Sequence, residues 1–199
     1  MMKANGVVTI LLCMVLAAGV SAAAEFGEEF AQATEVFNSY YKEEGSSWDE
    51  AMTKFAALDE RSPNNPAVLV YMGSLETLKA RDAWMPWTKI KWVEMGLERI
   101  DLALEKIAPS HDGEVVDGVA ASLLTRIVAV DTFLSVPGFL NRMQDANDVF
   151  ADMVDSVAFE SADKETLKTI YGLGLKIAER DEKTVDVEKW RKKIAKLAD

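Results

Sequence analysis

The stretch SSWDEAMTKFAALDERSPNNPAVLVYMGSLET, residues 46–77, decides the fold, because two apolar-periodic segments meet in it at a proline-rich corner. Over residues 48–58 apolar side chains recur every three or four positions, which predicts a helix with one apolar face. Pro63 and Pro66 each disfavour helical geometry in the residue before them, so the chain must turn here. Pro66 also suits the first turn of a following helix, where its missing N–H would have no partner anyway.

The segment after the corner predicts a second helix that lies close to a neighbour. Its apolar stripe is formed by Val68, Met72, Leu75 and Leu78. Gly73 lies on the flank of this stripe, and a glycine inside a helix costs about 1 kcal/mol relative to alanine. We therefore expect Gly73 to mark the place where another helix approaches closely.

These residues resemble the tetratricopeptide repeat, a family of stacked helical hairpins. In that family a small residue is followed four positions later by an aromatic one, as Ala51 is by Phe55. A Pro-Asn-Asn corner closes the second helix, as at residues 63–65, and Gly73 takes the place of the early glycine of the next repeat. One repeat length beyond Ala51, Met85 stands where the family has a small residue. The resemblance therefore implies an irregular tetratricopeptide-like array.

Residues 1–24 have the layout of a secretory signal peptide. Lys3 precedes an apolar run over 7–20, and the SAAA that follows predicts cleavage within residues 22–25. The apolar run is short for a bilayer span, and a retained membrane anchor is the alternative interpretation. Cys13, the single cysteine, lies inside this run, so the mature chain is predicted to have no disulfide and no thiolate site. Export from a bacterial cytoplasm implies a periplasmic protein.

The mature part, residues 25–199, predicts a single all-α domain of about eight antiparallel helices in stacked hairpins. No segment alternates apolar and polar residues long enough to predict a strand. Segment 115–136 is apolar on nearly every side, so we expect it to be the central buried helix. Ser161 is expected to cap the seventh helix. The predicted helices cover 26–44, 48–61, 66–83, 90–107, 115–136, 140–157, 161–177 and 184–197.

The charge of the mature part excludes one class of partner. It contains 21 lysines and arginines against 33 acidic residues, a formal charge of −12, because Lys3 is the only charged residue of the predicted signal. Such a surface repels phosphate backbones and anionic headgroups. We expect neither a nucleic-acid partner nor, after cleavage of the signal, a stable membrane span.

The chain offers no catalytic, metal or cofactor constellation. A zinc site needs several His or Cys ligands, and a Ser or Cys nucleophile needs a base. The single histidine, His111, lies beside Asp112 in a segment that predicts a turn, where we expect a solvated loop residue. The many carboxylates fall on the polar faces of predicted helices. We therefore expect no enzymatic activity, no catalytic or metal-ligating residue and no cofactor.

An aromatic segment over 71–92 is the candidate binding surface. Tryptophan, tyrosine and arginine are enriched at binding hot spots because they combine a large contact area with a polar group. Pro86 must break the helix here and leave at least one tryptophan accessible. The alternative is that these rings fill the core of an irregular hairpin. The candidate partner- or ligand-binding residues are Tyr71, Arg81, Trp84, Met85, Trp87 and Trp92.

Two functions from different classes follow. The first is a periplasmic tetratricopeptide-like adaptor that recognises a peptide or helix of a partner protein in its helical groove, as an accessory to an envelope or transport system. The alternative is a helical carrier or accessory subunit that holds a small hydrophobic or lipid-like ligand between hairpins for a transporter. An apolar cavity of about 300 Å³ or more would favour the carrier, whereas a shallow polar groove would favour the adaptor.

Overall fold

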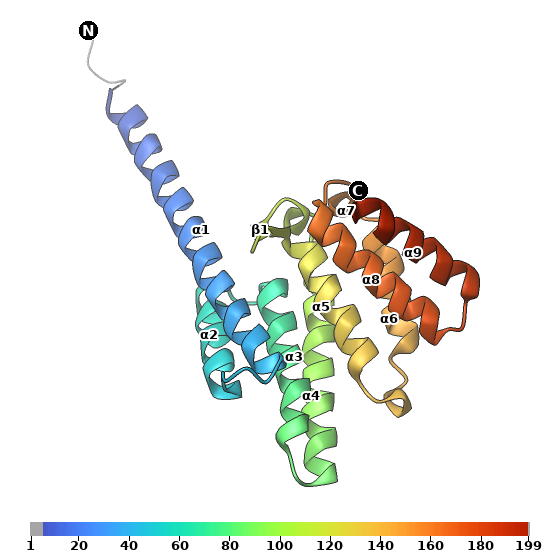
Figure 1. Cartoon of the computed structure of the whole chain (residues 1–199). Helices are drawn as coiled ribbons and strands as arrows, with labels where there is room; N and C mark the ends of the chain where they lie inside the picture. Colours follow the sequence, from blue (N-terminus) through green and yellow to red (C-terminus); the bar gives the residue numbers. More distant parts are fainter. Residues whose placement is uncertain (1–5, 199) are drawn as a thin grey trace.

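The computed structural model describes the backbone of residues 6–198 and the side chains of 24–197, and its fold is all-α as predicted (Figure 1). Within the described residues there are nine α-helices, one more than expected, because a single helical turn, α7, lies between the predicted sixth and seventh helices. The helices are α1 (Gly6–Tyr41), α2 (Trp48–Arg61), α3 (Pro66–Asp82), α4 (Pro86–Glu105), α5 (Ala121–Ser135), α6 (Met143–Val154), α7 (Val157–Glu160), α8 (Lys164–Arg180) and α9 (Thr184–Ala198).

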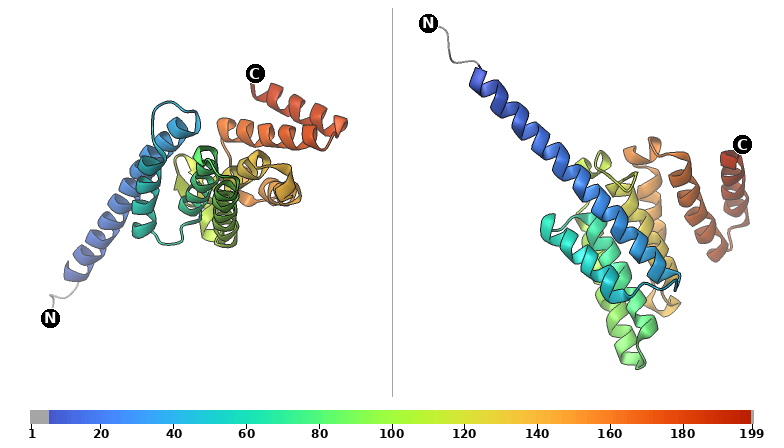
Figure 2. Two further views of the ribbon diagram at one scale, coloured as in Figure 1. Left: turned by 90° about the horizontal axis from the view of Figure 1, so that it is seen from below. Right: turned by 60° about the vertical axis from the view of Figure 1, so that its left-hand side comes forward.

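The long helices form four antiparallel hairpins: α1 with α2, α3 with α4, α5 with α6, and α8 with α9 (Figures 1 and 2). The first helices of these hairpins, α1, α3, α5 and α8, run in the same direction, and each packs against the next one. Two short 3₁₀ turns, η1 (Pro109–Asp112) and η2 (Gly138–Leu140), connect hairpins and helices. The predicted stacking of helical hairpins is therefore confirmed, while the hairpins start at unequal intervals along the chain.

The corner after α2 forms as the sequence predicts. Pro66 occupies the first turn of α3, and the side chain of Asn65 accepts hydrogen bonds from the amides of Ala67 and Val68 at 3.0 and 3.4 Å. Asn64 has a left-handed backbone with φ of 62°, a conformation that asparagine tolerates better than most residues. The caps thus satisfy amides that a helix start leaves without partners.

The close approach predicted at Gly73 is confirmed, and its partner is a second glycine. An added Cβ on Gly73 would lie 2.7 Å from the carbonyl oxygen of Gly96 on α4, and a Cβ on Gly96 would collide with the carbonyl oxygen of Gly73. The backbones of α3 and α4 therefore touch at this crossing. A bidentate ion pair lies nearby, in which the guanidinium of Arg99 donates to the carboxylate of the buried Glu76 at 2.7 and 2.9 Å.

The prediction of one helix over 115–136 is wrong for its first six residues. β1 (Val115–Val116) pairs antiparallel with β2 (Val119–Ala120), and α5 begins only at Ala121. Asp117 and Gly118 make the turn between the strands with positive φ angles of 51° and 78°. An Asp-Gly pair favours such a two-residue hairpin turn. The remainder is the central helix as predicted, with Leu123, Val130 and Phe133 almost fully buried.

The prediction for the start of α8 is also wrong. Asp163, not Ser161, is the capping residue, and its carboxylate accepts hydrogen bonds from the amides of Glu165 and Thr166 at 2.8 and 2.9 Å. The Ser161 hydroxyl instead donates to the carbonyl of Ala158, because Ser161 belongs to the end of α7. The backbone hydrogen bonds hold the pKa of Asp163 below its usual value.

The first helix is longer than the predicted 26–44. α1 runs without interruption from Gly6 to Tyr41 and so passes through the predicted cleavage region. Residues 1–5 of the predicted signal, and the side chains before Ala24, lie outside the described part, and cleavage stays a prediction. None of the described helices has an apolar stretch long enough to cross a membrane.

Candidate binding groove

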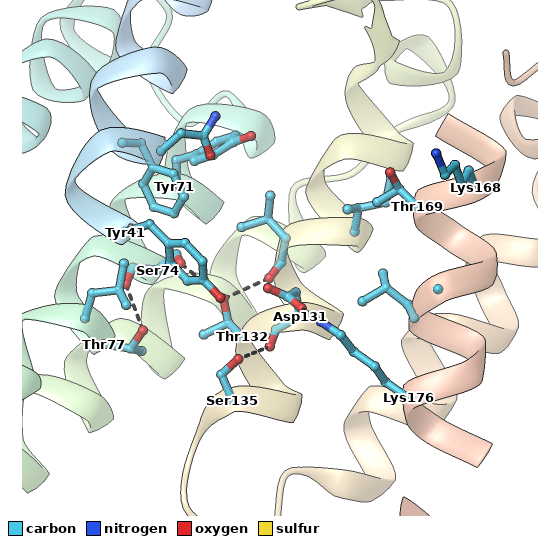
Figure 3. A pocket seen from close by; sticks show the side chains of 17 residues that line it. Tyr41, Tyr71, Ser74, Thr77, Asp131, Thr132, Ser135, Lys168, Thr169 and Lys176 are labelled. Carbon is cyan, nitrogen blue, oxygen red and sulfur yellow. Dashed lines mark hydrogen bonds and ion pairs between the residues drawn. The ribbon is translucent and has the colours of Figure 1, made fainter. Parts of the chain in front are cut away.

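The first helices of the four hairpins enclose one groove, with a volume of about 360 Å³ (Figure 3). Each helix contributes single residues or adjacent pairs that recur every three or four positions, which is a single helical face. The lining residues are Phe37, Asn38 and Tyr41 of α1; Tyr71, Ser74, Thr77 and Leu78 of α3; Ile127, Val128, Asp131, Thr132 and Ser135 of α5; and Lys168, Thr169, Gly172, Leu173 and Lys176 of α8.

Aromatic and aliphatic side chains form the inner wall of the groove. The Phe37 and Tyr71 rings meet edge to face with their centroids 4.9 Å apart, and Tyr71 also stacks on Phe55 at 5.0 Å. Burial raises the pKa of Tyr71 far above its usual value, so its phenol stays neutral in the folded protein. Ile127 and Leu173 add aliphatic surface from the opposite side. This wall suits apolar groups of a ligand.

Polar side chains gather where the groove opens. Asp131 of α5 and Lys176 of α8 form an ion pair at 2.7 Å, and Ser135 donates to the carbonyl oxygen of Asp131 at 2.7 Å (Figure 3). The side chain of Lys176 is 58% exposed and Tyr41 is 45% exposed, so this rim is open to solvent. Lys168 adds a second exposed ammonium. The rim can therefore orient an amphipathic ligand by charge and hydrogen bonding.

Hydroxyl groups lie between the apolar wall and the rim. Thr132 donates to the carbonyl oxygen of Val128 at 2.8 Å and lies 3.2 Å from the hydroxyl oxygen of Ser74. Thr77 donates to the carbonyl oxygen of Ser74 at 2.8 Å. These bonds satisfy the hydroxyls within their own helices, as is common for Ser and Thr in helices. The Thr77 and Thr132 hydroxyls therefore have partners within the protein.

Two glycines of α8 differ in what they face. An added Cβ on Gly172 would meet nothing within 4 Å, although Gly172 lines the groove, so a larger side chain there would project into open space. An added Cβ on Gly174 would lie 2.7 Å from the Trp190 ring and 2.8 Å from the Phe150 ring. Gly172 therefore keeps the groove open, whereas Gly174 allows α9 and α6 to pack against α8.

The six residues predicted as a binding surface do not form one cluster. Tyr71 alone lines the groove. Trp84, Met85 and Trp87 lie at the tip of the α3–α4 hairpin, where Trp84 is 88% and Trp87 65% exposed. Pro86 breaks the helix there, as predicted, and occupies the first turn of α4. Ligand binding by these residues stays a prediction.

Arg81 and Trp92, two of the six predicted residues, make contacts that hold helices together. The Arg81 guanidinium donates to the carbonyl oxygens of Tyr40 at 3.1 Å and Tyr41 at 3.3 Å, which ties the end of α1 to α3. The half-buried Trp92 ring meets the Trp48 ring edge to face at 5.6 Å. The core-filling interpretation therefore holds for Trp92, which packs on the core, whereas Trp84 and Trp87 face solvent.

His111 is not the solvated loop residue that the sequence suggests. It lies in η1, and its Nδ1 accepts a hydrogen bond from the amide of Ala108 at 2.8 Å. Its Nε2 lies 3.9 Å from the carboxylate of Glu114. Over the described residues, no group of three or more His, Cys, Asp or Glu side chains has the arrangement of a metal site.

The groove residues other than Tyr71 were not predicted from the sequence. A signal was present in the hydroxyl residues that interrupt otherwise apolar helices, namely Ser74 and Thr77 in α3 and Thr132 and Ser135 in α5. Their spacing of three puts each pair on one face. What the sequence does not specify is that these two faces, from segments more than 50 residues apart, point toward each other.

Comparisons with known proteins identify no relative of this chain. No protein-family model, no curated protein and no solved structure matches it.

Proposed function

We propose that this protein is an exported, tetratricopeptide-like binding protein that holds an amphipathic segment of a partner protein in the groove between α1, α3, α5 and α8. The observation that carries the proposal is the groove itself: four hairpins each present one face of their first helix to it. In helical repeat arrays the helices of successive repeats create an extended concave surface that binds other chains. The periplasm is the proposed compartment, and an envelope or transport system the proposed context.

The local resemblance to the tetratricopeptide repeat supports the proposal. Ala51 and Phe55, the small and aromatic residues of the motif, are both completely buried between α1, α2 and α3. The Asn65 cap and the Gly73 crossing occupy the positions that the resemblance implies. The intervals between hairpins, 55 residues from the start of α3 to that of α5 and 43 from α5 to α8, exceed the 34 of the repeat. The proposed array is therefore irregular beyond its first corner.

The chemistry of the groove favours an amphipathic occupant. An inner wall with Phe37, Tyr71 and Leu173 would take apolar side chains, and the Asp131–Lys176 pair at the exposed rim would meet polar or charged groups. A helix in a groove is recognised through apolar anchors on one face and polar groups on the other. The open rim also leaves room for the rest of a partner protein.

The volume of the groove favours a second candidate, a carrier of a small hydrophobic or lipid-like molecule. Small-molecule sites span about 300–1,000 Å³ and are mostly apolar. A volume of about 360 Å³ falls within that range. A compact apolar molecule could lie against Ile127 and Leu173 with a polar group at Lys176. The two candidates share one site and differ in its occupant.

One substitution tests both candidates. Gly172→Leu should fill the groove without a clash, because an added Cβ meets nothing within 4 Å, and should not weaken α8, because leucine favours a helix more than glycine. Gly27→Leu is the matched control: the same change at a glycine of α1 that also has open space and does not line the groove. Both variants should melt at or slightly above the temperature of the parent protein.

The readout is the occupant of the groove in cells. A photo-cross-linking amino acid at Leu78 should capture one partner protein, and capture should be lost with Gly172→Leu and kept with Gly27→Leu. The same amino acid at the exposed Val185 is the positional control. Mass spectrometry of organic extracts tests the carrier: a molecule present at about one per chain, and absent from Gly172→Leu, would assign the groove to it. Equal cross-linking and an empty extract in all variants would refute both candidates.

A further inference from the structure

The exposed aromatic rings of the described chain lie at one end of the molecule. Because α1, α3 and α5 run in the same direction, the turns that follow them are at the same end (Figures 1 and 2). The strongly exposed aromatic residues are Tyr41 at the end of α1, Trp84 and Trp87 in the α3–α4 turn, and Phe139 in the α5–α6 turn. Exposed aliphatic residues, in contrast, also occur at the opposite end, as Val115 in β1 and Val157 in α7 show.

The α3–α4 turn extends beyond the other turns at this end (Figure 1, and the right panel of Figure 2). Only residues 83–85 separate the two helices. Trp84 is 88% exposed, the ring of Trp87 follows one residue after Pro86, and Ile90 is exposed one turn further. We call residues 84–90 the hairpin tip. It is convex, and its tryptophans do not line the groove.

The charge around the hairpin tip differs in sign from that of the whole chain. Over residues 79–91 there are four basic residues and one acidic residue, whereas the chain as a whole carries a formal charge of −11. Arg81 and Lys79 are engaged with neighbouring groups, since Arg81 pairs with Glu43 and Lys79 lies near Asp82. Lys89 and Lys91 are exposed, and neither belongs to an ion pair within the described residues. The tip thus presents two ammonium groups beside two indole rings.

We propose that the hairpin tip docks onto a bilayer surface that contains anionic phospholipids. Tryptophan favours the headgroup region of a bilayer, where its ring is partly buried and its N–H can bond to polar groups. Lysines next to such rings are attracted by the negative surface potential, and two weak signals together give reversible binding. The acidic remainder of the surface is repelled and keeps the body of the protein away from the headgroups.

The shape of the tip favours a bilayer over a protein partner. A protein that binds protruding tryptophans must offer pockets that match them, because hot-spot side chains are buried in well-packed pockets. A fluid headgroup layer closes around a convex tip without a preformed pocket. The positive charge of the tip within an acidic chain is complementary to anionic lipid and has no comparable role in contacts with apolar surfaces. This inference is independent of what occupies the groove.

A fluorophore placed at the tip tests this docking directly. In the full-length chain with Cys13→Ser, Met85→Cys allows attachment of an environment-sensitive dye, and Val157→Cys places the same dye at the opposite end as a control. With vesicles of phosphatidylcholine and phosphatidylglycerol, the dye at position 85 should shift to the blue and the dye at 157 should not. Vesicles of phosphatidylcholine alone should give a much smaller shift, and added salt should reduce it.

Two variants separate the contributions to the docking. Lys89→Glu with Lys91→Glu should lower the dye-reported partitioning onto anionic vesicles by more than about tenfold. Trp84→Ser with Trp87→Ser should lower it on both kinds of vesicle, because the indoles contribute independently of charge. No shift at position 85 with anionic vesicles would refute the proposal. A shift that grows with protein concentration in the absence of vesicles would also refute it and assign the tip to a protein contact.

Discussion

The α3–α4 hairpin has two contrasting parts: the stem, where the two helices cross at Gly73 and Gly96, and the hairpin tip, residues 84–90. In the stem, Gly73 and Gly96 bring the two backbones into contact, and the Glu76–Arg99 pair links the same helices. At the tip, Trp84 and Trp87 have large apolar surfaces in solvent. One hairpin therefore combines a closely packed part with a part whose large apolar side chains are exposed.

Trp92 and Trp87 show the same contrast between two residues of one type. Trp92 lies on the same helix as Trp87, yet its ring packs against Trp48, whose indole N–H donates to the carbonyl oxygen of Leu75 at 2.9 Å. The position along the helix, not the identity of the residue, decides whether the ring is packed or exposed to solvent. A stability measurement can therefore distinguish stem from tip residue by residue.

The largest loss in the free energy of unfolding is expected for Gly96→Val. The added side chain would collide with the backbone of α3, including the Gly73 carbonyl oxygen, so the helices must separate. Overpacking a core usually costs about 1–3 kcal/mol, and a collision with backbone should exceed about 3 kcal/mol. Urea unfolding followed by circular dichroism measures the loss. Gly172→Ala, also in a helix but with open space, should be neutral or stabilising by up to about 1 kcal/mol; equal losses would contradict the crossing.

A smaller loss is expected for Glu76→Ala. Glu76 is 4% exposed, and its removal leaves the Arg99 guanidinium without its bidentate partner. The hydrogen bond to Glu76 is the main reason that the pKa of Arg99 is raised. Because the Arg99 side chain is about one-third exposed and can reach water, we expect about 2 kcal/mol instead of the 3–5 kcal/mol typical of a fully buried pair.

The control for Glu76 is an exposed pair elsewhere. Glu179→Ala removes the partner of Arg191, and both of these side chains are about half exposed or more. Exposed pairs contribute about 0–1 kcal/mol, so the free energy of unfolding should change little. Equal losses for Glu76→Ala and Glu179→Ala would show that the stem pair adds no more than a surface pair.

Trp92→Ala and Trp84→Ala test the contrast directly. Loss of a fully buried tryptophan costs about 3–5 kcal/mol, and for the half-buried Trp92 we expect about 2 kcal/mol. For Trp84, which is 88% exposed, the change should stay within about 0.5 kcal/mol. Thermal melts of both variants give the comparison. A loss at Trp84 as large as that at Trp92 would mean that the tip is part of the packed stem.

The sequence allowed the stem to be predicted better than the groove. A glycine inside a helix lowers helix stability, so Gly73 alone indicated that a neighbouring helix lies close. The corner at Pro63 and Pro66 follows from the stereochemistry of proline. The β-hairpin at 115–120 was missed because its apolar residues continue directly into α5, and the Asp117–Gly118 turn is the only local mark of the break. Local rules therefore located the long helices, misplaced some of their ends and missed the β-hairpin and the short α7.

The groove depends on which helix faces meet, and that information is not local. Phe37, Tyr71 and Leu173 each belong to an ordinary apolar stripe, and only the stacking order of the hairpins brings them together. The aromatic segment at the tip was conspicuous in sequence because its tryptophans are adjacent along the chain. Proximity in sequence indicated an unusual surface but joined residues that the fold separates, such as Tyr71 and Trp84.

A loss of stability smaller than that for Trp92→Ala is expected at neutral pH for Tyr40→Phe, at the base of the tip. The Tyr40 hydroxyl donates to the Asp82 carboxylate at 2.8 Å, and its loss should cost about 1 kcal/mol. Burial, with help from Asp82, raises the pKa of Tyr40 from 10.0 to about 12, so the folded state keeps a proton that the unfolded chain releases. The contribution of Tyr40 to stability is therefore complete below pH 10 and declines as the pH rises toward 12. Urea unfolding across this range should show that the free energy of unfolding declines less steeply with pH in Tyr40→Phe. Asp82→Ala should be intermediate, because burial is the larger cause of the raised pKa of Tyr40. An unchanged decline in Tyr40→Phe would show that this hydroxyl does not link α1 to the hairpin.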